Sequence, residues 1–545
     1  MPLSGDSKEK KGWREAAREA QEHRDESISH VLANTTEQDV AARITALDPT
    51  SIARMTDAGE LSAVQVVSAF LRQAAAAQQA TNCITELLGA RALRRAQALD
   101  AEPAEAERVR PLLGVPVSVK SHIGIAGGRM AAGYAAWWFT NPPAPRDALV
   151  IQILERAGAV AHARTTEPQS MMQLECASNL FGATRNPHRG SELSSGGSSG
   201  GEAALLALGG SALGVGSDVG GSIRVPAAAC GIFGLKPTAF RVPTTGWSST
   251  PPGADPVPTV VGPMCRTIDG IELFMAAVLA AEPWTVEPAL VPLPWRSIDL
   301  GLSLDKPLRI GIAWHDGTVQ PHPPIARALA QLAAGVRALP GVEVVEFPLY
   351  KADEAWAIAS SLYFTDGGAA DVAAMAASGE PPLPLVQWIL RESPGTKALT
   401  REELEYWLEE REEYRLEYAD YWNRTGCWDD GLGRWAGAVD VLVCPVAPGI
   451  ATGHGTAKYW AYSAMWNLLD YPALAFPAGR ASKELDVREQ RASFMSDHDR
   501  SNWGLYDADL FDGMSVGLQM VGRRFDDEKV VAVYRYLKEQ GCFGQ

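Results

Sequence analysis

The sequence predicts an α/β fold, in which buried strands alternate with helices. Short apolar runs typical of strands lie at residues 115–119, 211–217 and 440–445, and Pro445 ends the third run. Residues 201–208 form helix readily and directly follow a glycine-rich turn. We therefore expect a sheet with helices packed against it.

The first 60 residues are expected to form an N-terminal helical extension. Residues 7–30 carry opposite charges at helical spacing, which predicts a solvated helix. Helix-forming patterns continue between residues 48 and 104. Because the remainder has no internal repeat and no clear linker, residues 61–545 are expected to form one domain.

Two later segments are expected at the surface. Thr400 and Glu403 form a capping-box pattern at the start of a charged amphipathic helix over residues 400–422. Residues 481–505 are polar and irregular, which predicts an excursion before the last elements of the sheet.

Composition and charge argue against several classes of protein. The 545 residues are 46% hydrophobic and 21% charged, values typical of a soluble globular protein. The net charge of −16 argues against a nucleic-acid partner, because phosphate-backbone binding favours a basic face. Residues 1–24 lack the apolar core of a signal peptide, and the most apolar stretch, residues 203–216, is too short to span a membrane.

The cysteines and histidines also limit the possible functions. The seven cysteines are scattered and include no C-x-x-C pair, which indicates reduced thiols and a cytoplasmic location. Neither residue type has the spacing of metal ligands, so no metal site is expected. The sequence also lacks the glycine pattern of a nucleotide-binding loop.

Two serines lie in glycine-rich segments, and a lysine follows a predicted strand. Ser198 lies in residues 196–201 (GGSSGG), Ser222 lies in residues 218–224 (DVGGSIR), and Lys120 closes the first predicted strand. Glycine has no Cβ and tolerates positive φ, so these segments can turn backbone N–H groups toward a bound atom. A serine nucleophile with its own oxyanion hole needs that geometry. The trio suggests a serine nucleophile that works without histidine.

Four segments carry a resemblance to a known family: residues 114–120 (GVPVSVK), 196–202 (GGSSGGE), 218–226 (DVGGSIRVP) and 230–238 (CGIFGLKPT). Together they resemble the amidase signature family, and fainter similarity extends from about residue 81 to residue 522. Three further segments, residues 133–137, 363–368 and 466–472, are most similar to fungal general amidases and acetamidases.

The resemblance implies both a fold and an activity. The expected fold is an α/β/α arrangement with a central mixed β-sheet surrounded by helices, and residues 61–545 would be its catalytic domain. The expected reaction is hydrolysis of a non-peptide carboxylic amide to the acid and ammonia or an amine, through an acyl-enzyme and without a cofactor. The partner would be a small-molecule amide, and a homodimer is possible because dimers are common among relatives.

The resemblance also assigns roles to individual residues. It implies Ser222 as the nucleophile, Lys120 as the base, and Ser198 as the serine that bridges them, held by a cis peptide bond. The same resemblance implies an oxyanion hole formed by the backbone N–H groups of Val219, Gly220, Gly221 and Ser222. It also implies Ser199 as a hydrogen-bonding support. Asp218 and Arg224 flank the nucleophile and are expected to brace its loop as a structural pair.

A lysine base has to be neutral. Burial beside Val117 and Val119 would lower the pKa of Lys120 from its ordinary value of about 10.4. Relatives usually carry an acidic residue after the lysine, whereas this chain has Ser121, and the lack of an acidic neighbour is compatible with a neutral lysine. His122 could tune the charge of the site or simply pack in the core.

A nucleophile elbow explains fewer of these residues. The run Gly196–Gly200 fits the G-x-S-x-G pattern, which would make Ser198 the nucleophile and require an aspartate and a histidine. Available histidines are His315, His322, His454 and His498. That interpretation leaves Lys120 and the second glycine pocket unexplained. The same fold could also belong to a catalytically inactive binding protein, or to a transamidation subunit that works with partner subunits.

The substrate pocket is expected to include Met171. It lies in the loop at residues 169–172, which would line the pocket together with the aromatic stretch at residues 134–138 and the segments around Tyr459 and Trp466. The tryptophans would suit an apolar or aromatic acyl group, or they could pack the core instead.

Overall fold

A mixed sheet of 11 strands runs through the centre of the molecule in the order β1-β3-β2-β8-β10-β9-β16-β17-β15-β11-β12. The computed structural model describes residues 12–35, 41–102, 109–248, 256–302, 307–431 and 433–543. In sheet order the strands are β1 (Ile84–Leu87), β3 (Val160–Thr165), β2 (Pro116–Lys120), β8 (Leu213–Asp218), β10 (Val260–Cys265), β9 (Phe233–Lys236), β16 (Ala473–Arg480), β17 (Ser515–Val521), β15 (Val441–Pro445), β11 (Leu308–Ile312) and β12 (Val342–Glu346).

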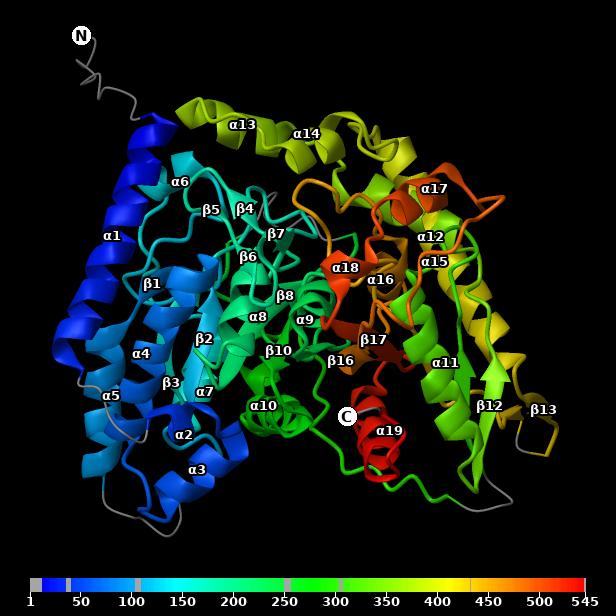
Figure 1. The fold of residues 1–545 in the computed structure, drawn as a ribbon, viewed down its shortest axis with the longest axis horizontal. Coiled ribbons are helices and arrows are strands. Elements are labelled where there is room, and N and C mark those ends of the chain that lie inside the picture. Colours follow the sequence, from blue (N-terminus) through cyan, green and yellow to red (C-terminus); the bar gives the residue numbers. More distant parts are fainter. Residues whose placement is uncertain are drawn as a thin grey trace.

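Parallel pairs lie toward both ends of the sheet and antiparallel pairs lie in the middle, except that the edge strand β1 is antiparallel to β3. β2 runs parallel to β3 and to β8, and β11 runs parallel to β12 and to β15. From β8 through β10, β9, β16 and β17 to β15 each neighbour is antiparallel. In Figure 1 the early strands β1–β3 accordingly lie on the left and β12 lies on the right.

Helices surround this sheet (Figure 1). They are α1 (Trp13–Asn34), α2 (Ala41–Thr45), α3 (Pro49–Asp57), α4 (Ala63–Thr81), α5 (Gly89–Ala101), α6 (Ala135–Thr140), α7 (Leu149–Arg156), α8 (Gly200–Ala207), α9 (Arg224–Cys230), α10 (Ile268–Ala280), α11 (Pro323–Arg337), α12 (Ala352–Tyr363), α13 (Ala369–Ser378), α14 (Pro384–Arg391), α15 (Arg401–Asn423), α16 (Ala461–Leu468), α17 (Asp497–Gly504), α18 (Ala508–Phe511) and α19 (Asp527–Glu539). Short two-stranded pieces pair β4 (Ala177–Ser178) with β5 (Gly182–Ala183), β6 (Arg185–Asn186) with β7 (Gly190–Ser194), and β13 (Cys427–Asp429) with β14 (Arg434–Ala436). The predicted α/β fold with a central mixed sheet is confirmed.

Local sequence signals placed several elements to within one or two residues. The strands expected at residues 115–119, 211–217 and 440–445 are β2, β8 and β15, and the helix expected after Ser198 is α8. The capping box before α15 is present, because Thr400 accepts from the N–H of Glu403 and the Glu403 side chain accepts from the N–H of Thr400. Every residue of β2 and of β8 is buried.

The segment at residues 481–505 differs in part from the prediction. Its last third forms the helix α17, which the polar composition concealed. Ser496 caps this helix by accepting a hydrogen bond from the N–H of Asp499, and Asp499 is itself buried against Arg491. Polar side chains that pair with one another can therefore support a helix that hydrophobic periodicity does not reveal.

The N-terminal helix α1 lies against the main body along the left edge of the molecule (Figure 1). Its Gln21 donates to the carbonyl of Leu180, and Ser27 accepts from the N–H of Leu87 in β1. The part of the predicted helix before residue 12 lies outside the described residues, and the domain boundary at residue 60 stays a prediction. None of the helices in the described ranges is long and apolar enough to cross a membrane.

Candidate active site

Lys120 is the last residue of β2, and its side chain is fully buried. Its Nζ atom donates to Ser198 Oγ at 2.5 Å and to Ser217 Oγ at 3.0 Å. Burial lowers the pKa of Lys120 to about 8, and the carboxylate of Glu167 opposes part of that shift. The ammonium group of Lys120 therefore loses its proton more readily than that of an exposed lysine.

Ser198 lies on the turn that leads into α8, and the Gly197–Ser198 peptide bond is cis. Gly197 packs directly on the backbone of Glu175, where a Cβ atom would lie 2.2 Å from the Glu175 carbonyl oxygen. A side chain at position 197 would therefore displace either the turn or the segment that contains Glu175.

Ser222 lies between β8 and α9, beside the turn that carries Ser198. The N–H of Ser199 donates to the carbonyl oxygen of Ser222 at 3.0 Å and ties the two glycine-rich segments together. Among the described residues no hydrogen bond joins the hydroxyl groups of Ser222 and Ser198. Such contacts often tighten only when substrate binds.

The expected oxyanion-hole donors differ from one another. The N–H of Gly221 already donates to Asp218 Oδ1 at 2.9 Å, so it is not free for a substrate oxygen. The N–H groups of Val219, Gly220 and Ser222 have no partner in the part of the chain that the structure describes. The predicted set of four open donors is thus reduced to three in this conformation.

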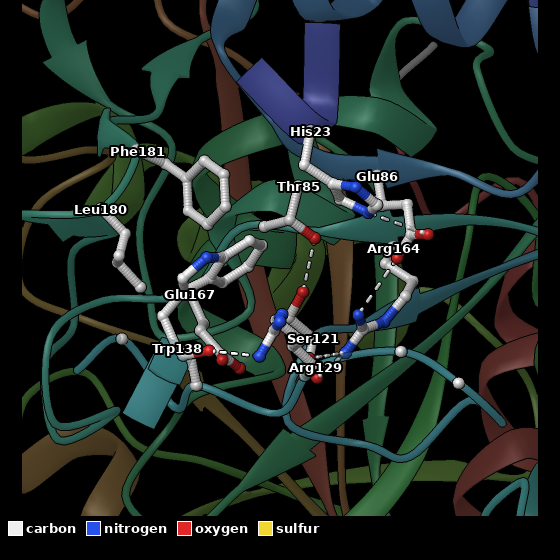
Figure 2. Close-up of a pocket in the computed structure, with 14 residues that line it drawn as sticks. His23, Thr85, Glu86, Ser121, Arg129, Trp138, Arg164, Glu167, Leu180 and Phe181 are labelled. Carbon is white, nitrogen blue, oxygen red and sulfur yellow. Dashed lines mark hydrogen bonds and ion pairs between the residues drawn. The ribbon is translucent and has the colours of Figure 1, made fainter. Parts of the chain in front are cut away.

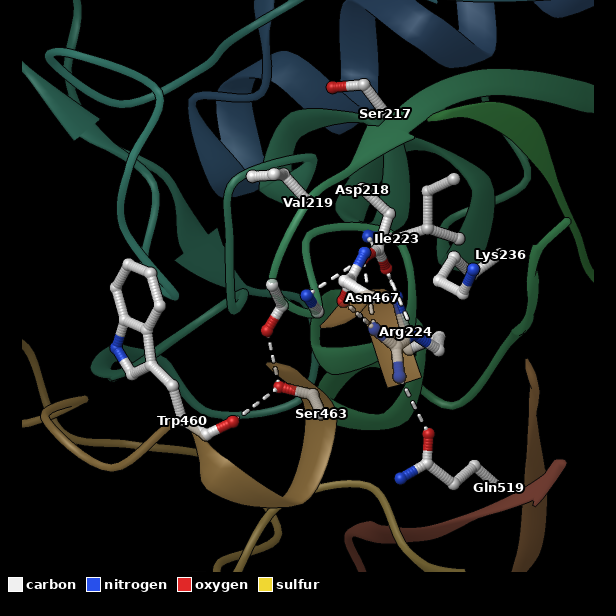
Figure 3. Close-up of polar contacts among 12 residues, drawn as sticks. Ser217, Asp218, Val219, Ile223, Arg224, Lys236, Trp460, Ser463, Asn467 and Gln519 are labelled. Carbon is white, nitrogen blue, oxygen red and sulfur yellow. Dashed lines mark hydrogen bonds and ion pairs between the residues drawn. The ribbon is translucent and has the colours of Figure 1, made fainter. Parts of the chain in front are cut away.

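Asp218 and Arg224 form a buried ion pair, with Nη2 and Oδ1 3.0 Å apart and both side chains fully inaccessible to solvent. Asn467 of α16 donates to Asp218 and accepts from Arg224, and Gln519 of β17 accepts from Arg224. Figure 3 shows the side chains of Asp218, Asn467 and Gln519 converging on Arg224. The ion pair holds the pKa of Asp218 well below its ordinary value.

Two hydrogen-bonding groups near Lys120 were missed in the sequence. Ser217 of β8 accepts from Lys120, and its N–H and carbonyl contact Ser199 Oγ. The two-residue alternation of β8 could have indicated Ser217.

The second group is Glu202, in the first turn of α8, which accepts from Ser118 at 2.5 Å and from Thr165 at 2.8 Å. Burial raises the pKa of Glu202 to about 8. Glu202 closes the segment at residues 196–202, but that segment gave it no role.

Glu167 provides a carboxylate near Lys120, although the residue that follows the lysine is Ser121. Glu167 accepts from the N–H of His122 at 2.9 Å and lies 3.0 Å from His122 Nδ1. Burial lowers the pKa of His122, and its ring packs against Trp247, so it is a core histidine. Ser121 forms a hydroxyl pair with Thr85 at 2.5 Å.

A cavity of about 70 Å³, lined by both charged and apolar side chains, adjoins Ser121 and Glu167. Figure 2 shows His23 of α1 reaching Glu86, which also pairs with Arg164, while Trp138 and Phe181 form the apolar wall. Arg164 additionally donates to the carbonyl of Ser121. The N-terminal helix therefore closes a cavity next to the residue that follows Lys120.

The expected pocket residues separate into two groups. Met171 has φ of 59° and belongs to the same apolar cluster as Val225, three residues after Ser222. Tyr459 lines a cavity together with Val225. Trp466 is fully buried in a different cluster, with its ring 6.0 Å from Tyr418, so it packs the core.

The loop before Glu175 carries unpaired polar groups. Gln173 is 3% exposed, and within the described ranges neither its amide nitrogen nor its amide oxygen has a hydrogen-bond partner. Ser170 has φ of 69° and a buried hydroxyl that also lacks a partner there. Unpaired polar groups are uncommon in protein interiors. Left-handed backbone at a residue other than glycine, as at Ser170, is concentrated at functional sites.

No histidine contacts Ser198 within the part of the chain that is described. His454 and His498 are exposed, and His322 is buried with Nε2 3.0 Å from the carbonyl of Asn502. The described residues also contain no group of three or more side chains able to hold a metal ion. The nucleophile-elbow interpretation therefore has no support in the geometry.

The fold and these motifs define a family. The family model "Amidase" matches residues 65–531, and the chain belongs to this family. It is a hydrolase that acts on amides.

Individual relatives agree with this assignment. "Amidase 1" of Gibberella moniliformis is 37% identical, over 97% of this chain and 99% of its own length. "Acetamidase" of Emericella nidulans is 34% identical, over 90% of this chain and 88% of its own length. A solved structure of "Fatty acid amide hydrolase" superposes with a TM-score of 0.86 at 31% identity and covers 97% of this chain and 94% of that chain. The expected similarity to fungal amidases and acetamidases is confirmed.

Proposed function

We propose that this enzyme hydrolyses a non-peptide carboxylic amide through Lys120, Ser198 and Ser222. The observation that carries the proposal is the 2.5 Å contact between Lys120 Nζ and Ser198 Oγ. Burial lowers the pKa of the same lysine to about 8. A neutral lysine can accept a proton from Ser198 while Ser198 takes one from Ser222.

In the first half of the cycle, Ser222 Oγ bonds to the amide carbon and its proton passes through Ser198 to Lys120. The carbonyl electron pair moves to oxygen, where the N–H groups of Val219, Gly220 and Ser222 stabilise the negative charge. When that pair returns, the carbon–nitrogen bond breaks. The same relay protonates the departing nitrogen, which leaves as ammonia or an amine.

In the second half, water attacks the acyl-enzyme. Its proton follows the same route to Lys120, a tetrahedral oxyanion forms again, and its collapse releases the carboxylic acid. Ser222 recovers its proton through Ser198, which restores the starting state. No cofactor enters any step. Asp218 and Arg224 take no proton in this scheme, and they hold the loop in place.

The test is a panel of small aliphatic, aryl and long-chain amides, assayed with the wild type and with Lys120→Ala, Ser198→Ala and Ser222→Ala. We expect each variant to lose at least about 1,000-fold in kcat, in the range found when one member of a catalytic unit is removed. Ser211→Ala is the matched control, because this buried serine donates to the carbonyl of Leu213 away from the relay.

Mass spectrometry of the wild type, quenched during turnover, should locate the acyl group on Ser222. Activity that survives in Ser222→Ala but not in Ser198→Ala would favour the nucleophile elbow instead. Activity of Lys120→Ala at the level of the wild type would remove the lysine from the relay and overturn the proposal.

We also propose that the protein is cytoplasmic. All seven cysteines are free and five of them are buried, which suits a reducing compartment.

A further inference from the structure

The peptide groups around Ser222 are held through their carbonyl oxygens. Val219 O accepts from the hydroxyl of Tyr363 at 2.8 Å, and Gly220 O accepts from Ser463 Oγ at 2.5 Å. Gly221 O accepts from the N–H of Val225 at 2.8 Å, in the first turn of α9. Three consecutive peptide groups are therefore fixed in orientation.

The orientation of each carbonyl determines that of an N–H group. In a trans peptide, the C=O of one residue and the N–H of the next point in opposite directions. Because Val219 O points to Tyr363, the N–H of Gly220 points away from it. In the same way, the contact with Val225 directs the N–H of Ser222. Both are among the donors without a partner in the described part of the chain.

The two open donors are held in different ways. A backbone hydrogen bond within the start of α9 directs the N–H of Ser222, whereas the side chain of Tyr363 directs the N–H of Gly220. The peptide between them is held at both ends, because Gly220 O contacts Ser463 and Gly221 N–H contacts Asp218. In Figure 3, Ser463 lies beside the loop that follows Asp218 and donates to it.

We propose that Tyr363 is a positioning residue that aims the N–H of Gly220 at the oxyanion formed during amide hydrolysis. The inference rests on the proposed function, since it assumes that the N–H of Gly220 serves the oxyanion hole. Tyr363 does not touch the reacting atoms. It acts through the Val219–Gly220 peptide group.

The surroundings of Tyr363 suit this role. Tyr363 ends α12, and its ring lies 6.3 Å from Trp460 and 6.4 Å from Trp356, which limits its movement. Burial raises the pKa of Tyr363, so its hydroxyl keeps the proton that it donates. A Cβ atom at Gly220 would lie 3.0 Å from the Tyr363 hydroxyl, so a glycine permits this close approach.

The Val219–Gly220 peptide needs the hydrogen bond of Tyr363 because residue 220 is a glycine. A glycine places little steric restriction on rotation of the peptide before it, so the Val219–Gly220 peptide depends on its hydrogen bond for orientation. Tyr363→Phe removes that hydrogen bond and preserves the ring. The carbonyl can then turn toward other donors, and the N–H of Gly220 turns with it.

The experiment compares Tyr363→Phe with Tyr421→Phe on an amide that the wild type hydrolyses. Tyr421 is a matched control, because its hydroxyl also donates to a backbone carbonyl at 2.8 Å, that of Pro348, and it is also partly buried. We expect kcat of Tyr363→Phe to fall about 10- to 100-fold with KM within twofold, since loss of one oxyanion donor costs about 100- to 1,000-fold. Tyr421→Phe should keep kcat within twofold.

A second measurement separates positioning from general damage. Inhibition by a trifluoromethyl ketone matched to the substrate, which forms an oxyanion adduct with a serine, should weaken by the same factor as kcat. Inhibition by the carboxylic acid product, which forms no such adduct, should change less than twofold. Ser463→Ala should lose less activity than Tyr363→Phe, because Asp218 still holds the other end of its peptide.

The outcomes distinguish this inference from the proposed function. Tyr363→Phe with kcat within twofold of an active wild type would overturn the inference and leave the relay intact. Equal weakening of the ketone and of the acid product would also overturn it, since that result indicates a disturbed pocket. An active Ser222→Ala variant would overturn the proposed function itself and, with it, this inference.

Discussion

The Nζ atom of Lys120 lies 2.5 Å from the Oγ atom of Ser198, although the two residues are 78 positions apart in the sequence. Lys120 arrives at the end of a central strand, and Ser198 arrives on the cis turn before α8. The buried position of both groups excludes bulk water from this contact. A proton can then pass between Lys120 and Ser198 along their hydrogen bond without exchanging with bulk water.

The rate of hydrolysis should depend on the protonation of Lys120. The base is active when neutral, and its neutral fraction increases as the pH rises through its pKa of about 8. We expect kcat/KM to rise with pH, about tenfold per unit below pH 7, and to level off above pH 9. A pH profile between 5.5 and 10 measures this.

Lys236 supplies the control for that profile. Burial also lowers its pKa to about 8, but its Nζ atom donates to the carbonyl of Pro237 rather than to a serine. Lys236→Met should leave the midpoint unchanged. A midpoint that moves in this variant, or a flat profile in the wild type, would contradict the assignment to Lys120.

The buried carboxyl of Glu202 should make the protein less stable as the pH rises. Its pKa is about 8 in the folded protein and 4.5 ordinarily, so between these values the folded state binds more protons than the unfolded state. The free energy of unfolding then decreases with pH across that window. Glu202→Gln cannot titrate, so urea denaturation should show the variant gaining stability relative to the wild type from pH 5 to pH 8.

Glu405→Gln, at an exposed position in α15, provides the comparison and should keep the pH dependence of the wild type. If Glu202→Gln and the wild type differ by the same amount at both pH values, Glu202 does not titrate in this range.

Removal of the Asp218 side chain should lower the free energy of unfolding substantially. Asp218→Ala leaves Arg224 buried without its ionic partner and releases the N–H of Gly221. We expect a loss of about 3–5 kcal/mol in the free energy of unfolding, measured by urea denaturation. Glu405→Ala removes an exposed ion pair with Arg401 and should change stability by no more than the error of the measurement. Equal losses in the two variants would show that burial of the Asp218 pair is unimportant.

Met171 and Trp466 should respond differently to truncation. Met171→Ala should change the relative kcat/KM for short and long acyl groups with little change in Tm, because Met171 is only partly buried and packs against the same apolar cluster as Val225. Trp466→Ala should lose about 3–5 kcal/mol of stability and keep the acyl preference, because its ring fills the core. Unchanged selectivity in Met171→Ala would remove Met171 from the pocket.

Local patterns were sufficient for much of the fold. The apolar run before Lys120 and the capping box at Thr400 each depend on neighbouring residues, so both elements lie within one or two residues of the prediction. The helix α17 was missed because its support is the contact of Asp499 with Arg491 rather than a hydrophobic stripe. The pairing of strands β15 and β11, which lie far apart in the chain, has no local signal either.

The glycine-rich motifs in the sequence were sufficient to indicate Ser198 and Ser222 as candidate site residues, because only a few backbone conformations place a serine beside its own N–H donors. The tertiary structure decided the rest. It brought Ser217 to the lysine and Glu202 to Ser118, and it occupied the N–H of Gly221 with Asp218. It also placed Trp466 in the core and set Tyr363 against Val219. These outcomes depend on contacts between segments distant in the chain, and burial and hydrogen bonding there are properties of the packed molecule rather than of any segment of the sequence.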